Sequence, residues 1–95
     1  MYYVYILQCA DDTLYTGSTS DLCRRLAAHN RGKGAKYTRS RLPVRMVYAE
    51  EQPDRSAALR REAAVKKLTR AQKKTLIAQS PYRDPDTGKT EAVTC

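Results

Sequence analysis

The chain opens with two strand-forming stretches, YYVYILQ (residues 2–8) and LYTGST (residues 14–19), separated by the polar turn ADDT (residues 10–13). β-Branched and aromatic residues dominate both stretches, and this composition favours strands. Aspartate favours turns because its short side chain bonds to the neighbouring backbone. Residues 2–19 are therefore predicted to form a β-hairpin.

A helix, a basic loop and a third strand are predicted after the hairpin. Ser20 or Asp21 can cap a helix that reaches about Asn30, because short polar side chains accept hydrogen bonds from the first free backbone N–H groups. Residues 31–45 are rich in glycine, lysine and arginine and predict a loop. Residues 44–51 (VRMVYAEE) predict a strand.

Two helices end the predicted domain. The first covers residues 56–68, and its apolar side is expected to carry Leu59, Ala63 and Leu68. Thr69 and Gln72 have the spacing of a capping box, which predicts a second helix to about Gln79. The order strand–strand–helix–strand–helix–helix predicts a small α/β (α+β) domain.

Charge gives the first indication of a partner. The chain has 95 residues, enough for one domain, and carries a net charge of +8. Basic residues concentrate at 24–45 and 60–74, whereas acidic residues concentrate at 11–12, 50–54 and 84–91. A basic surface can serve solubility alone, but this segregation favours a face that binds a polyanion.

The end of the chain differs in composition from the rest. Residues 80–95 combine prolines, a glycine and scattered charges with little to bury, so we expect a domain at 1–79 and a disordered tail at 80–95. No apolar run approaches the ~20 residues that span a bilayer. The cysteines are odd in number and widely spaced, without a CxxC pair, which favours reduced thiols in a cytoplasmic protein over a zinc site.

Tyr5 and Tyr15 lie on the two strands of the predicted hairpin. Tyrosine is a common strand residue, and propensity alone explains most tyrosines in this chain. The two phenols lie on one face of the sheet only if the turn contains an odd number of residues. On one face they can serve a common site.

Arg25 is predicted on the apolar side of its helix, at helical spacing from Leu22, Leu26 and His29. A charged group beside buried leucines needs a partner. That partner is either a structural carboxylate or a phosphate, which matches the guanidinium fork. His29 one turn later is either a site residue or a histidine that stabilises the helix C-terminus.

Glu62 is the only acidic residue between Asp54 and Asp84, and basic residues surround it. It is predicted on the core side of its helix. Such a carboxylate either forms ion pairs, with Lys66 at i+4 as the nearest partner, or holds a divalent metal ion together with phosphate oxygens and waters.

Taken in order, Tyr3-Val4-Tyr5, Tyr15-Thr16-Gly17, Arg25 and Glu62 resemble the GIY-YIG nuclease superfamily, and most of all its short, single-domain bacterial branch. The resemblance covers about residues 1–78. It implies a three-stranded antiparallel sheet flanked by helices. It also implies hydrolysis of DNA phosphodiester bonds with one divalent ion, Mg²⁺ or Mn²⁺.

The resemblance also assigns roles by position. It implies catalytic roles for Tyr5, Tyr15, Arg25 and His29, and it makes Glu62 the metal ligand. The chain departs from the motif at Tyr3, where the family name has glycine, and at Thr16, where it has isoleucine. No asparagine follows Glu62 where some members have one, so one contact of the family's site is missing.

Nucleic-acid binding is expected from the basic loop and from the helix that carries Glu62. The predicted contacts are Lys33, Lys36, Tyr37, Arg39, Arg41, Arg61, Lys66 and Lys67. Tyr37 can stack on a base or fill a gap in the core. The expected substrate is DNA, with RNA as a second polyanion, and the chain is expected to act as a monomer without a membrane.

Three functions remain open at this point. The first is a metal-dependent endonuclease in DNA repair or processing. The second is a nucleic-acid-binding module with little or no catalytic activity. The third is a subunit that a protein partner recruits through residues 80–95. The chain shows no base-reading helix, so specificity is expected from DNA shape or from a protein partner.

Overall fold

A three-stranded antiparallel sheet forms the centre of the protein. The computed structural model describes residues 1–79, and the tail predicted at 80–95 lies outside the described residues. The strands are β1 (Tyr2–Gln8), β2 (Leu14–Thr19) and β3 (Arg45–Gln52), and β1 lies between the other two. The helices are α1 (Leu22–Asn30), α2 (Lys36–Arg39), α3 (Arg55–Lys66) and α4 (Arg70–Gln79).

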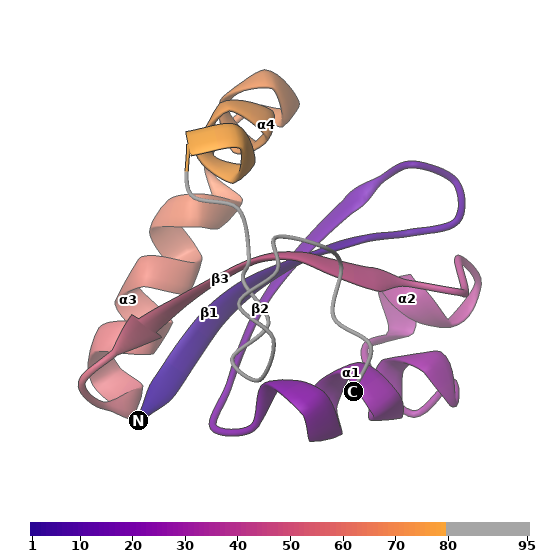
Figure 1. Ribbon diagram of the computed structural model, residues 1–95, viewed down its shortest axis with the longest axis horizontal. Helices are drawn as coiled ribbons and strands as arrows, with labels where there is room; N and C mark the ends of the chain where they lie inside the picture. Colours follow the sequence, from indigo (N-terminus) through magenta and orange to yellow (C-terminus); the bar gives the residue numbers. More distant parts are fainter. Residues whose placement is uncertain (80–95) are drawn as a thin grey trace.

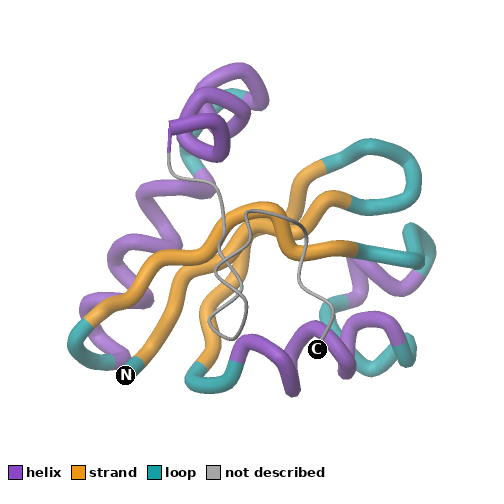
Figure 2. Tube along the Cα trace, in the orientation of Figure 1, coloured by secondary structure: helices purple, strands orange, loops and turns teal. Residues whose placement is uncertain are grey.

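The helices cover both faces of this sheet (Figures 1 and 2). Successive residues of a strand point to opposite faces. Tyr5 and Leu7 of β1 therefore join Leu26 of α1 in one apolar cluster, whereas Val4 and Ile6 join a second cluster with α3 and α4. The predicted α+β architecture is confirmed. In the part of the chain that the structure describes, no helix is long and apolar enough to cross a membrane.

Short polar side chains start the helices as predicted. The Asp21 carboxylate accepts the backbone N–H of Arg24 at 3.1 Å and caps α1. The capping box before α4 is also present, because Thr69 N–H donates to Gln72 Oε1 at 2.9 Å and Gln72 N–H donates to Thr69 Oγ1 at 3.2 Å. These side chains satisfy backbone donors that a helix leaves without partners at its start.

The predicted loop at 31–45 contains a short helix that the sequence did not indicate. The α2 helix has four residues. Four residues are too few to show the periodic pattern of apolar residues that indicates a helix. It is held by side chains, since the Thr38 hydroxyl donates to the Ala35 carbonyl at 2.9 Å and Arg41 Nη1 donates to the Tyr37 carbonyl at 2.8 Å.

The predicted apolar side of α3 was wrong for Leu59 and Ala63, whereas Leu68, which follows the helix, does pack against the apolar cluster. The residues of α3 that become buried are Ala58 and Val65, whereas Leu59 is 49% exposed and Ala63 is also exposed. Two polar contacts set this rotation of the helix. Arg61 pairs with Glu50 of β3 at 2.8 Å, and the adjacent Glu62 accepts a hydrogen bond from Ser18 of β2. A hydrophobic pattern alone does not report such contacts.

The orientation of α3 is tested by shortening one apolar side chain on each side of it. Val65→Ala removes two buried methyl groups and should lower the free energy of unfolding by about 2 kcal/mol. Leu59→Ala is the matched control and should change it by less than about 0.5 kcal/mol, because exposed positions contribute little. Urea unfolding measures both, and equal losses would contradict this orientation.

Candidate active site

Tyr5 and Tyr15 lie on the same face of the sheet. Five residues, 9–13, join the two strands, and Tyr5 pairs with Gly17 while Leu7 pairs with Tyr15. Tyr15 is therefore opposite a residue two positions from Tyr5, and the side chains of both point to the α1 face. The odd-numbered turn that the sequence argument required is present.

The absence of a side chain at Gly17 leaves room for the Tyr5 ring. A Cβ atom on Gly17 would lie 2.5 Å from the Tyr5 hydroxyl oxygen and 2.7 Å from the ring carbon that bears it. Any side chain here would displace the phenol. The glycine of the Tyr15-Thr16-Gly17 stretch thus allows the Tyr5 ring to cross directly over β2, where its side chain is 1% exposed.

The Tyr5 hydroxyl joins α1 to the sheet through two hydrogen bonds. It lies 3.0 Å from His29 Nε2, and Arg25 Nε donates to it at 3.4 Å. Burial raises the pKa of Tyr5, and the hydrogen bond and charge of Arg25 oppose only part of that effect. Tyr5 is therefore a neutral phenol.

Arg25 finds its partner in this phenol rather than in a carboxylate. Within residues 1–79, Arg25 forms no ion pair, and its two terminal amino groups make no hydrogen bond. The side chain is partly exposed. The positive charge and the two terminal amino groups, which have no partner within residues 1–79, can therefore bind an anionic ligand.

His29 is fully buried between the two tyrosines and α2. Its ring makes edge contacts with Tyr5 and Tyr15, at 6.0 and 5.5 Å between centroids, and its Nδ1 lies 2.8 Å from Thr38 Oγ1. Burial, assisted by the positive charge of Arg25, lowers the pKa of His29 to about 4. The ring is neutral at pH 7, so it does not act as a cation at the C-terminus of α1.

Tyr15 is half-buried and stacks on Tyr37, with 5.9 Å between ring centroids. The Arg41 guanidinium lies 4.0 Å from the Tyr37 ring centroid and pairs with Asp11 at 3.0 Å. Tyr37 is therefore engaged with Tyr15 and Arg41, two residues of the same molecule. It braces the Tyr15 ring from the side of α2.

Glu62 lies beyond β2, on the other face of the sheet. Ser18 follows Gly17 in β2 and donates to Glu62 Oε1 at 2.5 Å, and Lys66 pairs with Glu62 Oε2 at 2.7 Å. The predicted i+4 pairing with Lys66 is confirmed. Burial disfavours the charge of Glu62, but the hydrogen bonds from Lys66 and Ser18 outweigh it and lower the pKa of the carboxyl.

The candidate site residues lie on both sides of the outer strand β2. Tyr5, Tyr15, Arg25 and His29 lie on one side of it and Glu62 on the other, with Gly17 and Ser18 between them. They interact electrostatically: after burial and the effects of Arg25 and Tyr15, the charge of Glu62 also raises the pKa of Tyr5. Phenols, a guanidinium without an ion pair in residues 1–79 and a carboxylate therefore lie at one edge of the sheet.

A family model described as the GIY-YIG catalytic domain matches residues 1–75. The chain belongs to the GIY-YIG family. Among curated relatives, a UPF0213 protein of Natronomonas pharaonis is 53% identical over 77 residues, which are 81% of this chain and 91% of that protein. A UPF0213 protein of Syntrophus aciditrophicus is 55% identical over 82 residues, covering 85% and 94% of the two chains.

Two solved structures are also similar to this GIY-YIG domain. The solution NMR structure of a UPF0213 protein from Bacillus halodurans has 48% sequence identity and a TM-score of 0.54, covering 83% of this chain and 85% of that one. The solution NMR structure of a protein from E. faecalis has 46% identity and a TM-score of 0.56, covering 82% and 83%. These names describe the relatives and give no activity.

Glu62 suits the divalent ion expected for this family. Among residues 1–79, no group of three or more His, Cys, Asp or Glu side chains surrounds a metal position. One carboxylate is nevertheless enough when phosphate oxygens and waters complete the shell of a hard cation. Glu62 is ionised and 17% exposed, and the Lys66 side chain that pairs with it is 49% exposed.

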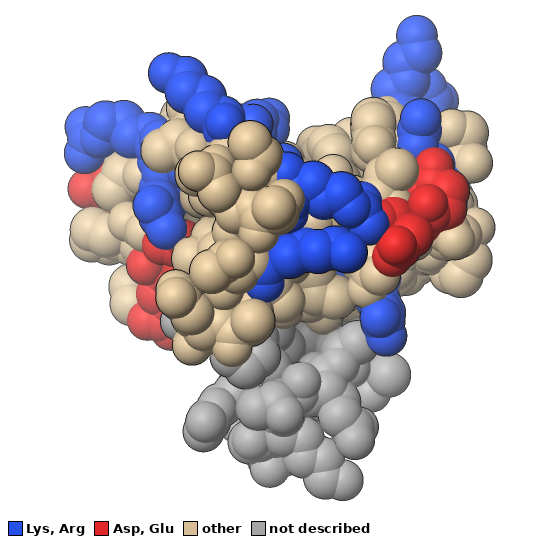
Figure 3. Space-filling model, turned by 90° about the horizontal axis from the view of Figure 1, so that it is seen from above, with Lys and Arg blue, Asp and Glu red and all other residues tan. Residues whose placement is uncertain are grey.

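The predicted nucleic-acid contacts divide into two groups. The exposed side chains of Lys33, Lys36, Arg39 and Lys67 form no ion pair within residues 1–79. Arg41, Arg61 and Lys66 each pair with a carboxylate instead, and Arg61 holds α3 on the sheet. Figure 3 shows that Lys and Arg side chains spread over the face seen from α4, with acidic groups gathered at a few places.

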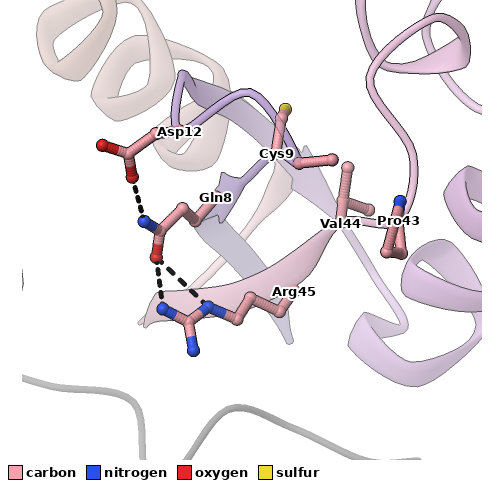
Figure 4. Close-up of a pocket in the computed structure, with 7 residues that line it drawn as sticks. Gln8, Cys9, Asp12, Pro43, Val44 and Arg45 are labelled. Atoms are coloured by element: carbon pink, nitrogen blue, oxygen red, sulfur yellow. Dashed lines mark hydrogen bonds between the residues drawn. The ribbon is translucent and has the colours of Figure 1, made fainter.

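A separate pocket of about 300 Å³ lies near the hairpin turn (Figure 4). It is lined by Gln8, Cys9, Ala10, Asp12, Pro43, Val44 and Arg45. The Gln8 side chain bridges its two charged residues, because its amide nitrogen donates to Asp12 and its oxygen accepts from Arg45. None of the predicted site residues lines it.

Sequence reasoning missed Gly17, Ser18 and Thr38 as parts of the site. Gly17 carried a signal, since a glycine inside a strand often marks a close approach of another group. Ser18 and Thr38 carried none, because a single hydroxyl in a polar stretch has many uses.

The buried neutral His29 predicts a pH dependence of stability. Its pKa falls from an ordinary 6.5 to about 4 in the folded protein, so the unfolded chain binds more protons between these values. The free energy of unfolding should therefore fall as pH drops through this window, by about 1.4 kcal/mol per unit and about 3 kcal/mol in all. Chemical unfolding from pH 7 to pH 4 measures the effect.

His29→Gln is the control for this experiment. It keeps a polar side chain but removes the titrating group, while the carboxylates that titrate in the same range remain. The difference between the two proteins should shrink as pH falls from 6.5 to 4. Parallel profiles would contradict a neutral, buried histidine.

Proposed function

We propose that the protein is a metal-dependent endonuclease that hydrolyses phosphodiester bonds of DNA. The observation that carries the proposal is Arg25, whose Nε is held by the Tyr5 hydroxyl while its two terminal amino groups have no partner within residues 1–79. A guanidinium presented in this way suits a phosphate, which two parallel N–H groups can bind side by side.

Arg25 has two tasks in this proposal. It binds the phosphate of the bond to be cut, and it stabilises the additional negative charge that develops on the phosphoryl group in the transition state. Tyr5 supports both tasks because its hydrogen bond fixes the direction of the guanidinium. Tyr5 is thereby a positioning residue, since its own hydroxyl is buried away from solvent.

Tyr15 is the phenol that we assign to the attacking water. It is the more exposed of the two tyrosines, and its ring is braced by His29 and Tyr37. A phenol orients water well but removes its proton only where cations stabilise the phenolate. Arg25 supplies such a charge on the same face of the sheet.

Glu62 would hold the divalent ion, Mg²⁺ or Mn²⁺, at the opposite side of β2. When bound, the ion supplies Lewis-acid stabilisation to phosphate oxygens. Lys66 and Ser18 keep the Glu62 carboxyl ionised before the ion arrives. Lys33, Lys36, Arg39 and Lys67 would bind neighbouring phosphates of the DNA backbone.

We place this activity in DNA repair or processing in the cytoplasm, with the chain acting as a monomer. RNA offers the same phosphate chemistry as a second substrate. Specificity would come from the shape of the nucleic acid or from a protein partner.

A nucleic-acid-binding module without catalysis is the second candidate. One observation favours it: both oxygens of Glu62 already accept hydrogen bonds, one from Ser18 and one from Lys66. If these contacts persist with nucleic acid bound, a metal ion has to compete with the Lys66 ammonium for the carboxylate. Binding would then be independent of divalent ions and no strand would be cut.

Cleavage assays separate the two candidates. Supercoiled, linear, branched and single-stranded DNA are incubated with the protein and Mg²⁺ or Mn²⁺. Glu62→Gln and Arg25→Ala should each lower the cleavage rate about 10²–10³-fold, since Arg25 would contact the reacting phosphate and Glu62 would hold the ion that stabilises it. Glu51→Gln, at an exposed position of β3, is the matched control and should keep the rate of the unmodified protein.

Cleavage that survives both site substitutions would contradict the endonuclease assignment. Tyr15→Phe and Tyr5→Phe test the separate roles of the two phenols. Tyr15→Phe should lower the rate constant of the chemical step, whereas Tyr5→Phe should also weaken substrate binding through Arg25. The reverse pattern would exchange the roles of the two tyrosines.

The basic surface is tested separately by the salt dependence of binding. Each phosphate contact releases about one counterion, so Lys33→Gln, Lys36→Gln, Arg39→Gln and Lys67→Gln should each reduce the slope of log K against log salt by about 1. Arg55→Gln, at the start of α3, is the control. Unchanged slopes in all four variants would place the nucleic acid on another face.

A further inference from the structure

Tyr5 belongs to a chain of hydrogen bonds, and the positions of the atoms determine which group donates and which accepts in each bond. Four groups follow one another, from Arg25 through Tyr5 and His29 to Thr38, and the distances between successive partners are 3.4, 3.0 and 2.8 Å. Tyr5, His29 and Thr38 are all at most 1% exposed. Bulk water therefore does not take part, and the protons must be shared among these groups.

Thr38 fixes the first proton. Its hydroxyl lies 2.9 Å from the Ala35 carbonyl oxygen, which can only accept, so the single hydroxyl proton lies between these two oxygens. Donation to His29 instead would leave two acceptors facing each other at hydrogen-bond distance. The hydroxyl therefore accepts from His29, and the proton of the neutral imidazole is on Nδ1.

The other half of the chain follows from this tautomer. With its proton on Nδ1, neutral His29 has a lone pair on Nε2 and can only accept there. The Tyr5 hydroxyl must then donate to Nε2 at 3.0 Å. Its oxygen lone pairs remain for the N–H of Arg25. Every buried proton in the chain has one acceptor.

We infer that Thr38 is a positioning residue of the site, which sets the tautomer of His29 and thereby turns the Tyr5 oxygen toward Arg25. Loss of the Thr38 acceptor removes the reason for the proton to stay on Nδ1. On Nε2 the proton would point at the Tyr5 oxygen and compete there with Arg25. The inference rests on the proposed function only for its effect on cleavage.

The surroundings of His29 make this hydroxyl the natural partner for Nδ1. The ring lies directly over Gly34, where a Cβ atom would overlap Nδ1 and its neighbouring ring carbons. Tyr5 and Tyr15 contact the ring from the sheet side. In the described residues, Thr38 is the one group that hydrogen-bonds Nδ1. Gly34 and Thr38 of the α2 region thus form one half of the histidine pocket.

Nitrogen NMR tests the tautomer without any substrate. The chain contains one histidine, so the ring nitrogen signals need no assignment between residues. Uniformly ¹⁵N-labelled protein at pH 7 should show Nδ1 with the shift of a protonated nitrogen and Nε2 with the shift of an unprotonated one. The opposite pattern in the unmodified protein would overturn the inference.

Thr38 variants then test the cause. Thr38→Ser keeps the hydroxyl and should keep both nitrogen shifts, whereas the isosteric Thr38→Val should move the proton to Nε2 or mix the two forms. Dispersed amide spectra show that each variant is folded, and Thr38→Ala serves as a second apolar variant if Val does not fold. Unchanged shifts in a folded apolar variant would overturn the role of Thr38.

Cleavage supplies the last measurement. Thr38→Val should slow cleavage at least about 10-fold through misplacement of Arg25, while Thr38→Ser should restore the rate to within a factor of about 2. Equal rates for all three proteins would overturn the positioning role. A protein that cuts no DNA in any form would contradict the proposed function alone, because the nitrogen shifts still decide the tautomer.

Discussion

The site depends on one buried contact, the hydrogen bond between the Tyr5 hydroxyl and His29 Nε2 at 3.0 Å. A phenol this deep requires a partner for its proton, because burying a polar group without one is costly. His29 satisfies it from α1, and Gly17 leaves the space above β2 that the ring occupies. The same contact ties the first helix to the central strand, so fold and site share it.

The second constraint acts from the other face of the sheet. Adjacent residues of α3, Arg61 and Glu62, reach β3 and β2, the two outer strands. The helix is thereby centred beneath β1, with Ala58 and Val65 against the apolar cluster. The packing of α3 that stabilises the domain also places Glu62 at the edge of β2. The Glu62 side chain is 17% exposed there.

The sequence predicted what depends on local pattern and on residue type. The hairpin, a short polar cap at Ser20 or Asp21 and the capping box at Thr69 follow from short-range chemistry, and the structure has the hairpin, a cap at Asp21 and the capping box. The motif order identified the family, which the match over residues 1–75 establishes. The roles of Tyr5, Tyr15, Arg25, His29 and Glu62 in catalysis remain predictions.

What the sequence did not predict arises from contacts between distant segments. The face of α3 was misjudged because Leu59 is more apolar than Ala58, yet two polar contacts to the sheet decide the rotation. Tyr37 was expected either to stack on a base or to fill a gap in the core; in the structure it stacks on Tyr15 and is 39% exposed. Thr38 had no signal at all, since its task exists only where α2 meets α1.

The paired anchors of α3 restrict how this family member can diverge. Substitutions that preserve one polar group at each anchor leave the helix in place. A single-residue insertion or deletion between Ala58 and Val65 turns everything beyond it by about 100° around the helix axis. Such a change separates the buried alanine from the buried valine, so the two can no longer pack on the sheet together while both anchors hold. The length of this segment should therefore be less variable than its composition.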